Sequence, residues 1–308
     1  MPLHPEIARI LADLPAPPPG PLDPAAMRAG EEAQVPPLEE RLPLHDVRDT
    51  IAVTPAGEVP VRVYTPTGTD TSGLVIYFHG GAFFLGSLDT HDHIARQLAK
   101  ATGCTVVSVG YRRAPEAQFP AGLDDCYGVA RWAADHGDEL HWDGNTLAVA
   151  GDSSGGTFAA AVAALAHDDG FDRITHQVLY YPSLDLDFDT DRYASLRENA
   201  EGYGVETAGL PAFNSFYFDS GADPADPRVS PIKRGDLTGL PAALIVTAEY
   251  DPMRDEGELY GARLTEAGVP ATVRRYAGAN HGFVQNFSWI PEFAQVFDET
   301  AEFLRQGK

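Results

Sequence analysis

The sequence has little lysine, little cysteine and no long hydrophobic run. Lysine occurs only at Lys100, Lys233 and Lys308, and 45 acidic residues against 22 basic ones give a formal net charge of -23. A chain this acidic is unsuited to binding nucleic acid or an anionic membrane surface, because those partners carry the same sign of charge. We attribute the excess of acid to solubility, with adaptation to salt as the alternative.

Cys104 and Cys126 are the only cysteines, and they offer no disulfide framework. We expect both to be buried, reduced thiols. The first residues lack the basic and then apolar pattern of a secretory signal, and no apolar run reaches the roughly 20 residues of a membrane span. We therefore expect a cytoplasmic protein without a membrane partner. No spacing of ligands suggests zinc or an EF-hand, so we expect neither a metal nor a cofactor.

Apolar runs of strand length recur along the chain, at residues 74–79, 104–110, 146–151, 177–182 and 242–249. Two further strands are predicted at residues 49–53 and 61–66, and helical patterns at 91–103, 122–137 and 155–170. Apolar strands that alternate with amphipathic helices are typical of an α/β fold with a mainly parallel sheet covered on both faces. In such folds, sites form beyond the carboxyl ends of the strands.

Two segments fall outside this alternation. Residues 1–45 contain a short amphipathic helix, predicted over 4–14 with Ile7, Ile10, Leu11 and Leu14 on one side, and then a proline-rich connector. Residues 183–230 mix acids, aromatics and turn residues, and an insertion this long is often a lid. We predict that both segments form a cap on a core of residues 46–182 and 231–308, in one structural unit.

The stretch Gly151-Asp152-Ser153-Ser154-Gly155 follows an apolar strand and precedes a helix of small residues. This strand–turn–helix context is what a nucleophile elbow requires, with Ser153 as the nucleophile. Glycines on either side would remove side chains that collide across the bend. A phosphate-binding glycine turn is the alternative, but the Gly-Lys-Ser/Thr ending of a Walker A motif is missing.

A serine needs a base, and the base needs an acid to orient it. Of ten histidines, His281 in AGANHGFVQ follows the alternating run of residues 272–276 and can reach the elbow. His79 is the other candidate, and we expect it to orient a loop. In folds that carry a serine on such an elbow, the order along the chain is serine, then the acid, then histidine. We prefer Asp251, just past a strand, over Glu249 and Asp255.

The run YFHGGAFFLGS places glycines directly after a strand, where bare backbone can approach a substrate. We expect the backbone N–H groups of Gly80 and Gly81, with Ala82 as a further candidate, to form an oxyanion hole together with that of Ser154. Neighbouring apolar side chains are usually core residues, but some should line an apolar substrate pocket. The candidates for the pocket are Phe83, Phe84, Leu85, Phe213, Phe216 and Tyr217.

The chain resembles the bacterial branch of the hormone-sensitive lipase family of α/β-hydrolases. The matching pieces are YFHGGAFFLGS, YRRAPEAQFPAGLDD, GDSSGG, ENAEGY, DPMRDEG and NHGF, in family order across residues 74–284. The resemblance implies an α/β-hydrolase fold with a helical cap, and hydrolysis by water of small carboxylic esters with short to medium acyl chains. It also implies a homodimer.

The chain departs from the family pattern at Ala82, where glycine is common, and at Ser154, where alanine is commoner. Only backbone N–H groups are needed at both positions, and we expect the Ser154 hydroxyl to bond to nearby backbone. The resemblance makes Arg112 and Arg113 structural ion-pair residues.

Three alternatives use the same fold. An amidase or a lactonase would share the triad and differ in the pocket. A non-catalytic receptor for a small molecule, like the plant gibberellin receptors of this family, would lack the catalytic histidine, which this chain retains. A lipase acting on emulsified fat would need a membrane-binding surface, which the acidic composition disfavours.

Overall fold

The computed structural model describes residues 2–14, 20–68 and 72–306. The described strands are β1 (Asp46–Thr54), β2 (Gly57–Thr65), β3 (Ser72–Phe78), β4 (Thr105–Val109), β5 (Trp142–Asp152), β6 (His176–Tyr180), β7 (Ala242–Tyr250) and β8 (Ala271–Asn280). They form one sheet in the order β1-β2-β4-β3-β5-β6-β7-β8. β2 pairs antiparallel with both β1 and β4, and the pairs from β4 to β8 are parallel. The predicted, mainly parallel sheet is confirmed.

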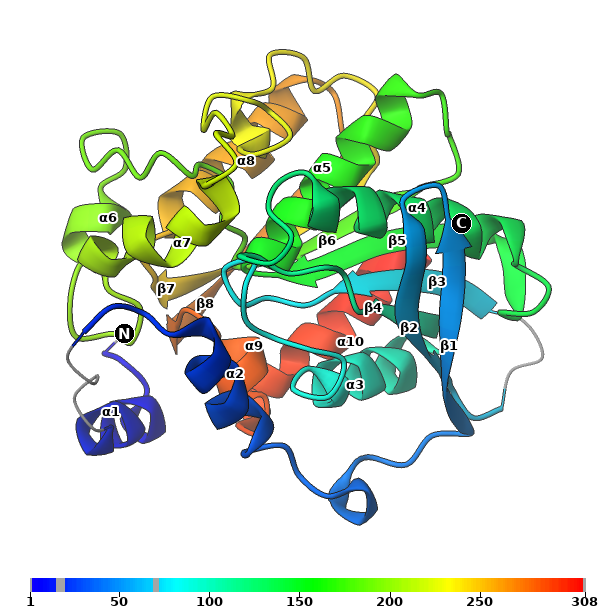
Figure 1. Cartoon of the computed structure of the whole chain (residues 1–308), viewed down its shortest axis with the longest axis horizontal. Coiled ribbons are helices and arrows are strands. Elements are labelled where there is room, and N and C mark those ends of the chain that lie inside the picture. The colour runs from blue at the N-terminus through cyan, green and yellow to red at the C-terminus, as the bar shows by residue number, and fades with distance from the viewer. Residues whose placement is uncertain (1, 15–19, 69–71, 307–308) are drawn as a thin grey trace.

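Helices cover both faces of this sheet (Figure 1). One face packs against α4 (Ala121–Asp135), α5 (Ser154–Asp168) and α8 (Arg254–Glu266), and the other against α3 (Asp92–Thr102), α9 (Phe283–Phe287) and α10 (Pro291–Arg305). Along β3, Ile76 belongs to the first core and Tyr77 to the second, because successive side chains of a strand point to opposite faces. This explains why the central strands are apolar throughout.

Several shorter elements lie outside the layers of the core. They are α1 (Pro5–Asp13), α2 (Pro24–Glu32), α6 (Ser195–Glu198) and α7 (Leu210–Phe218), with 3₁₀ turns at Leu38–Glu40, Thr207–Gly209 and Pro231–Lys233. Asp23 caps α2 by accepting hydrogen bonds from the N–H groups of Ala25 and Ala26. In Figure 1 these four helices lie together at one side of the molecule, next to β7 and β8.

The two parts of the predicted cap pack against the same hydrophobic cluster. Met27 of α2 packs with Phe213 and Phe216 of α7 against Phe84, which follows β3. Of the apolar side of the predicted first helix, Ile7 is buried, but Leu14 is 59% exposed, because α1 ends before it. The proline-rich connector lies partly at residues 15–19, outside the described residues. The exact division into cap and core stays a prediction.

The two cysteines are buried, as expected, and no disulfide joins them. Within the described residues, no helix has the length and apolar character needed to cross a membrane. The same part of the chain holds no cluster of histidine, cysteine or acidic side chains suited to a metal ion.

Candidate active site

The turn between β5 and α5 forces an unusual backbone conformation on Ser153. Its φ is 53° and its ψ is -120°, backbone angles that residues other than glycine rarely adopt. A Cβ on Gly151 would lie 2.2 Å from the carbonyl oxygen of Gly155, and a Cβ on Gly155 would lie 2.0 Å from that of Phe78. The glycines of the motif are therefore required by the bend, which presents Ser153 at the carboxyl end of β5.

The structure brings together the three side chains of the predicted triad. The Nε2 atom of His281 lies 2.9 Å from Oγ of Ser153, and its Nδ1 atom lies 2.8 Å from Oδ2 of Asp251. Each residue follows a strand, and the carboxyl ends of parallel strands share one edge of a sheet. A carboxylate at Nδ1 holds the hydrogen of a neutral imidazole there and leaves Nε2 free to accept the serine proton.

The acids that the sequence left as alternatives have other partners. Oε2 of Glu249 accepts a hydrogen bond of 2.7 Å from the N–H of Gly278. Asp255 accepts from the N–H of Ser195 at 2.8 Å and pairs with Arg254. Neither carboxylate contacts the histidine of the triad, so the geometry favours Asp251.

The 183–230 insertion contacts the loops that carry Asp251 and His281, and no sequence prediction above includes this contact. The side-chain amide of Asn199 donates to the carbonyl oxygen of Asp251 at 3.0 Å, and Ser195 Oγ donates to that of Pro252 at 2.6 Å. The amide of Asn280, just before the histidine, donates to the carbonyl oxygen of Tyr203 at 2.8 Å. The polar residues of ENAEGY were the available signal for this contact.

Gly80 does not belong among the oxyanion donors. Its N–H donates to Oδ1 of Asp152 at 2.9 Å, so it points at this carboxylate and is not available to a substrate. Within the described chain, the structure gives no hydrogen-bond acceptor for the N–H groups of Gly81, Ala82 and Ser154. The geometry therefore argues against Gly80 among the four predicted donors and leaves Gly81, Ala82 and Ser154 as the candidates.

The loop that carries the candidate oxyanion donors has a left-handed backbone at three successive residues, 81–83. The φ angles are 117° at Gly81, 48° at Ala82 and 66° at Phe83. Left-handed backbone costs roughly 1–2 kcal/mol for a residue that carries a Cβ. The Ser154 hydroxyl accepts a hydrogen bond from the N–H of Phe83, so the prediction that it bonds to nearby backbone is confirmed.

His79 is buried beneath this loop and is stacked on Tyr111, with 4.2 Å between the ring centroids. Its Nδ1 atom lies 2.9 Å from the carbonyl oxygen of Gly80. Burial lowers the pKa of His79 to about 3, so its ring is neutral at physiological pH. These contacts fit the predicted role of orienting the loop.

Asp152 is also buried, and it accepts a 2.5 Å hydrogen bond from the hydroxyl of Tyr77. Burial alone would raise the pKa of this carboxyl group. The nearby His91 and the hydrogen bonds that Asp152 accepts outweigh burial and hold its pKa below the usual value. The carboxylate that faces the oxyanion loop is therefore ionised.

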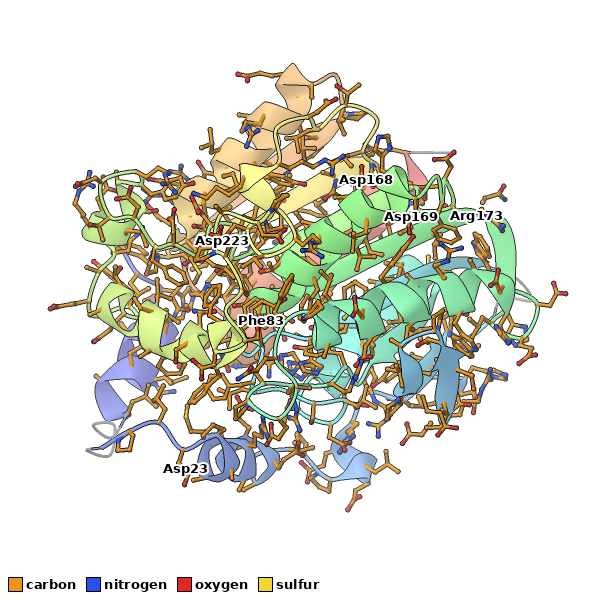
Figure 2. The ribbon with its side chains drawn as sticks, turned by 45° about the horizontal axis from the view of Figure 1, so that its top comes forward. Asp23, Phe83, Asp168, Asp169, Arg173 and Asp223 are labelled. Atoms are coloured by element: carbon orange, nitrogen blue, oxygen red, sulfur yellow. The ribbon has the colours of Figure 1, made fainter. Side chains whose placement is uncertain are left out.

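The proposed pocket residues form two aromatic groups. Phe83 stacks on Tyr217 of α7 with 3.9 Å between centroids, and both are almost completely buried. Phe84 packs against Phe213 and Phe216, with Leu85 in the same cluster. In Figure 2, Phe83 is labelled beside α7. The stacking packs α7 against the loop after β3, and a role in binding substrate stays a prediction.

Arg112 and Arg113 differ in their partners. Arg112 forms a bidentate ion pair with the buried Asp125, as the resemblance implied. Arg113 instead donates to the carbonyl oxygen of Gly86, and no described carboxylate lies within ion-pair distance of it. The expectation of an ion pair at Arg113 is therefore wrong, because the nearby Glu116 is already held by Arg28.

The site combines a serine on a sharp turn after one strand with an acid and a histidine from the loops after later strands of the same sheet. This arrangement defines the class of serine-dependent α/β-hydrolases. The model of the alpha/beta hydrolase fold family matches residues 75–285. The chain belongs to this family, in its hormone-sensitive lipase branch.

Its relatives include an arylesterase from Saccharolobus solfataricus, 40% identical over 79% of this chain and 78% of that protein. Esterase LipI from Mycobacterium tuberculosis is 39% identical over 86% of this chain and 84% of its own length. Among solved structures, a hyperthermophilic esterase from Pyrobaculum calidifontis aligns with a TM-score of 0.90 at 40% identity and covers 99% of each chain.

Proposed function

We propose that this protein is a serine carboxylesterase that hydrolyses short- to medium-chain carboxylic esters. The observation that carries the proposal is the continuous hydrogen-bonded chain from Ser153 through His281 to Asp251, with distances of 2.9 and 2.8 Å. The esterase names of its relatives agree with this activity.

In the first step, Oγ of Ser153 attacks the ester carbonyl carbon while Nε2 of His281 takes the hydroxyl proton. The carbonyl oxygen becomes an anion and binds the N–H groups of Gly81, Ala82 and Ser154. The bond to the alkoxy group then breaks, and His281 returns the proton to the leaving alcohol. The acyl group remains on the serine as an ester.

In the second step, His281 removes a proton from water, and the hydroxide attacks the acyl-serine carbonyl carbon. The same three N–H groups bind the second oxyanion. When the bond to Ser153 breaks, His281 returns the proton to the serine oxygen and the free acid leaves. Neither step needs a metal or a cofactor, because the carbonyl is polarised by backbone dipoles.

We also propose that the protein acts in the cytoplasm and forms a homodimer. Two buried cysteines without a disulfide are typical of a reducing compartment. The homodimer is supported by the family resemblance, and the sheet ends in β1 and β8, which pair on one side only within the described chain. Light scattering on the purified protein tests it, and a monomer mass would refute it.

The experiment that tests the function is hydrolysis of p-nitrophenyl esters from acetate to palmitate by wild type and Ser153→Ala. The expected result is a rate that peaks at short acyl chains and collapses in the variant. Ser108→Ala is the matched control, since Ser108 is buried in β4 and its hydroxyl has no partner among the described residues. Absence of turnover in wild type, or full activity in Ser153→Ala, would refute the proposal. Amides and lactones would then be tested in its place.

A further inference from the structure

The hydroxyl group of Ser154 has no part in the proposed reaction, which uses only the backbone N–H of this residue. The residue is 1% exposed and lies in the first turn of α5. Its Oγ atom accepts a hydrogen bond of 3.2 Å from the N–H of Phe83, 71 positions earlier in the chain. A side chain of the elbow therefore holds the backbone of the oxyanion loop.

A second bond holds the same loop from the other end. The carboxylate of Asp152 accepts a hydrogen bond of 2.9 Å from the N–H of Gly80. The two residues that carry the loop's candidate donors, Gly81 and Ala82, lie directly between Gly80 and Phe83. Both anchoring side chains are neighbours of the nucleophile in sequence, so the loop is fixed relative to the serine on each side of the donors.

The conformation of the loop explains why such anchors are needed. Ala82 and Phe83 both have φ angles in the left-handed region, which a free loop would leave. Hydrogen bonds from the N–H groups of Phe84 and Leu85 to the carbonyl oxygen of Gly81 shape the turn from within. Those internal bonds do not join the loop to the elbow. The two anchors do, together with the contact of the Phe83 ring with Phe158 of α5, at 5.2 Å between centroids.

We propose that the Ser154 hydroxyl is a positioning group for the oxyanion hole. By holding Phe83, the hydroxyl keeps the N–H groups of Gly81 and Ala82 directed toward the position of the substrate oxyanion, where the N–H of Ser154 also donates. Donors fixed in advance stabilise a developing anion without reorganisation during the reaction. The proposal rests on the carboxylesterase function proposed above and adds a residue that acts through its neighbours.

The test is Ser154→Ala, which keeps the backbone N–H and removes the oxygen that holds Phe83, together with the contact of that hydroxyl with Tyr111. Misplacing a catalytic group by about 1 Å costs ~10²-fold in rate. All donors remain in this variant, so we expect kcat to fall by about 10-fold while KM changes by less than about twofold. The pH dependence of kcat/KM should not change, because the hydrogen bonds of His281 are untouched.

A trifluoromethyl ketone separates positioning from mere packing. It forms an anionic tetrahedral adduct with the serine, and the adduct's oxygen occupies the oxyanion hole. Its inhibition constant should rise by the same factor as kcat/KM falls. Ser108→Ala is again the control, and it should change neither the kinetic constants nor the affinity for the ketone.

The outcomes are distinguishable. If wild type hydrolyses esters and Ser154→Ala keeps the wild-type kcat, this proposal fails and the proposed function stands. The proposal also fails if the variant loses thermal stability or kcat while the ketone binds as tightly as before, since the hydroxyl would then serve packing alone. If wild type hydrolyses no ester, the proposed function fails, and this inference fails with it.

Discussion

Replacing Asp251 by asparagine should remove most of the activity by reversing the tautomer of His281. Oδ2 of Asp251 lies 2.8 Å from Nδ1 of the imidazole, and its Oδ1 accepts a hydrogen bond of 2.8 Å from the N–H of Met253. In the variant, the amide oxygen must face Met253, because an NH₂ group cannot accept. The NH₂ group then donates to Nδ1, and the imidazole hydrogen moves to Nε2, which can no longer take the proton of Ser153.

The loss expected from this wrong tautomer is about 10⁴-fold in kcat, equal to about 5 kcal/mol of transition-state stabilisation. KM should change little, since the carboxylate does not face the substrate. The assay is steady-state hydrolysis of p-nitrophenyl butyrate at fixed pH, with circular dichroism to show that the variant is folded.

Glu249→Gln and Asp255→Asn are the controls for this choice of acid. Glu249 bonds to Gly278 and Asp255 to Ser195, away from the imidazole, so both variants should keep kcat within about threefold of wild type. A loss below about tenfold in Asp251→Asn, or an equal loss in either control, would refute the reasoning.

Three further predictions concern the surroundings of the site. Burial raises the pKa of Glu256, whose carboxyl oxygen accepts from the N–H of Leu184, well above its usual value. A carboxyl group whose pKa is higher in the folded than in the unfolded state lowers the stability of the fold as pH rises above its unfolded pKa. Glutamine carries no such charge, so Glu256→Gln should raise Tm relative to wild type more at about pH 8 than at about pH 5. An equal shift at both pH values would contradict this. Gly81→Ala would place a Cβ 2.5 Å from the carbonyl carbon of Leu85 at a φ of 117°, so kcat should fall by at least ~10²-fold in a folded protein, and an unchanged kcat would be contrary evidence. Dialysis against EDTA should leave kcat unchanged, because the triad and the backbone N–H groups supply both steps, whereas activity lost and then restored by a divalent metal would show otherwise.

Much of the core could be predicted from the sequence because its strands are buried on both faces. In β3, Ile76 and Tyr77 serve different cores, so the run is apolar throughout and its length alone indicates a strand. The helix α10 is not among the predicted helices, although Phe293, Val296 and Phe297 have helical spacing and are buried. These residues lie after the last motif, and no predicted strand follows them to mark a helix between two strands.

The candidate site could be predicted as far as it depends on chain order. Serine, acid and histidine each follow a strand, and parallel strands bring those positions to one edge. The direction of a backbone N–H could not be predicted from the sequence, because it depends on local φ angles and on a partner far away in the chain. The N–H of Gly80 faces Asp152, 72 positions later, and nothing in the glycine-rich motif reveals that contact. The polar residues of ENAEGY indicate that Asn199 has a polar partner, but they do not show that this partner is the carbonyl oxygen of Asp251.

Covalent labelling tests the central claim, that Ser153 is the nucleophile, most directly. A p-nitrophenyl alkylphosphonate should phosphonylate the enzyme with release of nitrophenol, and the loss of esterase activity should follow the same time course. We predict a single adduct per chain, which peptide mass spectrometry places on Ser153, and no adduct in Ser153→Ala. An adduct on another residue, or full esterase activity in the fully labelled protein, would contradict the account.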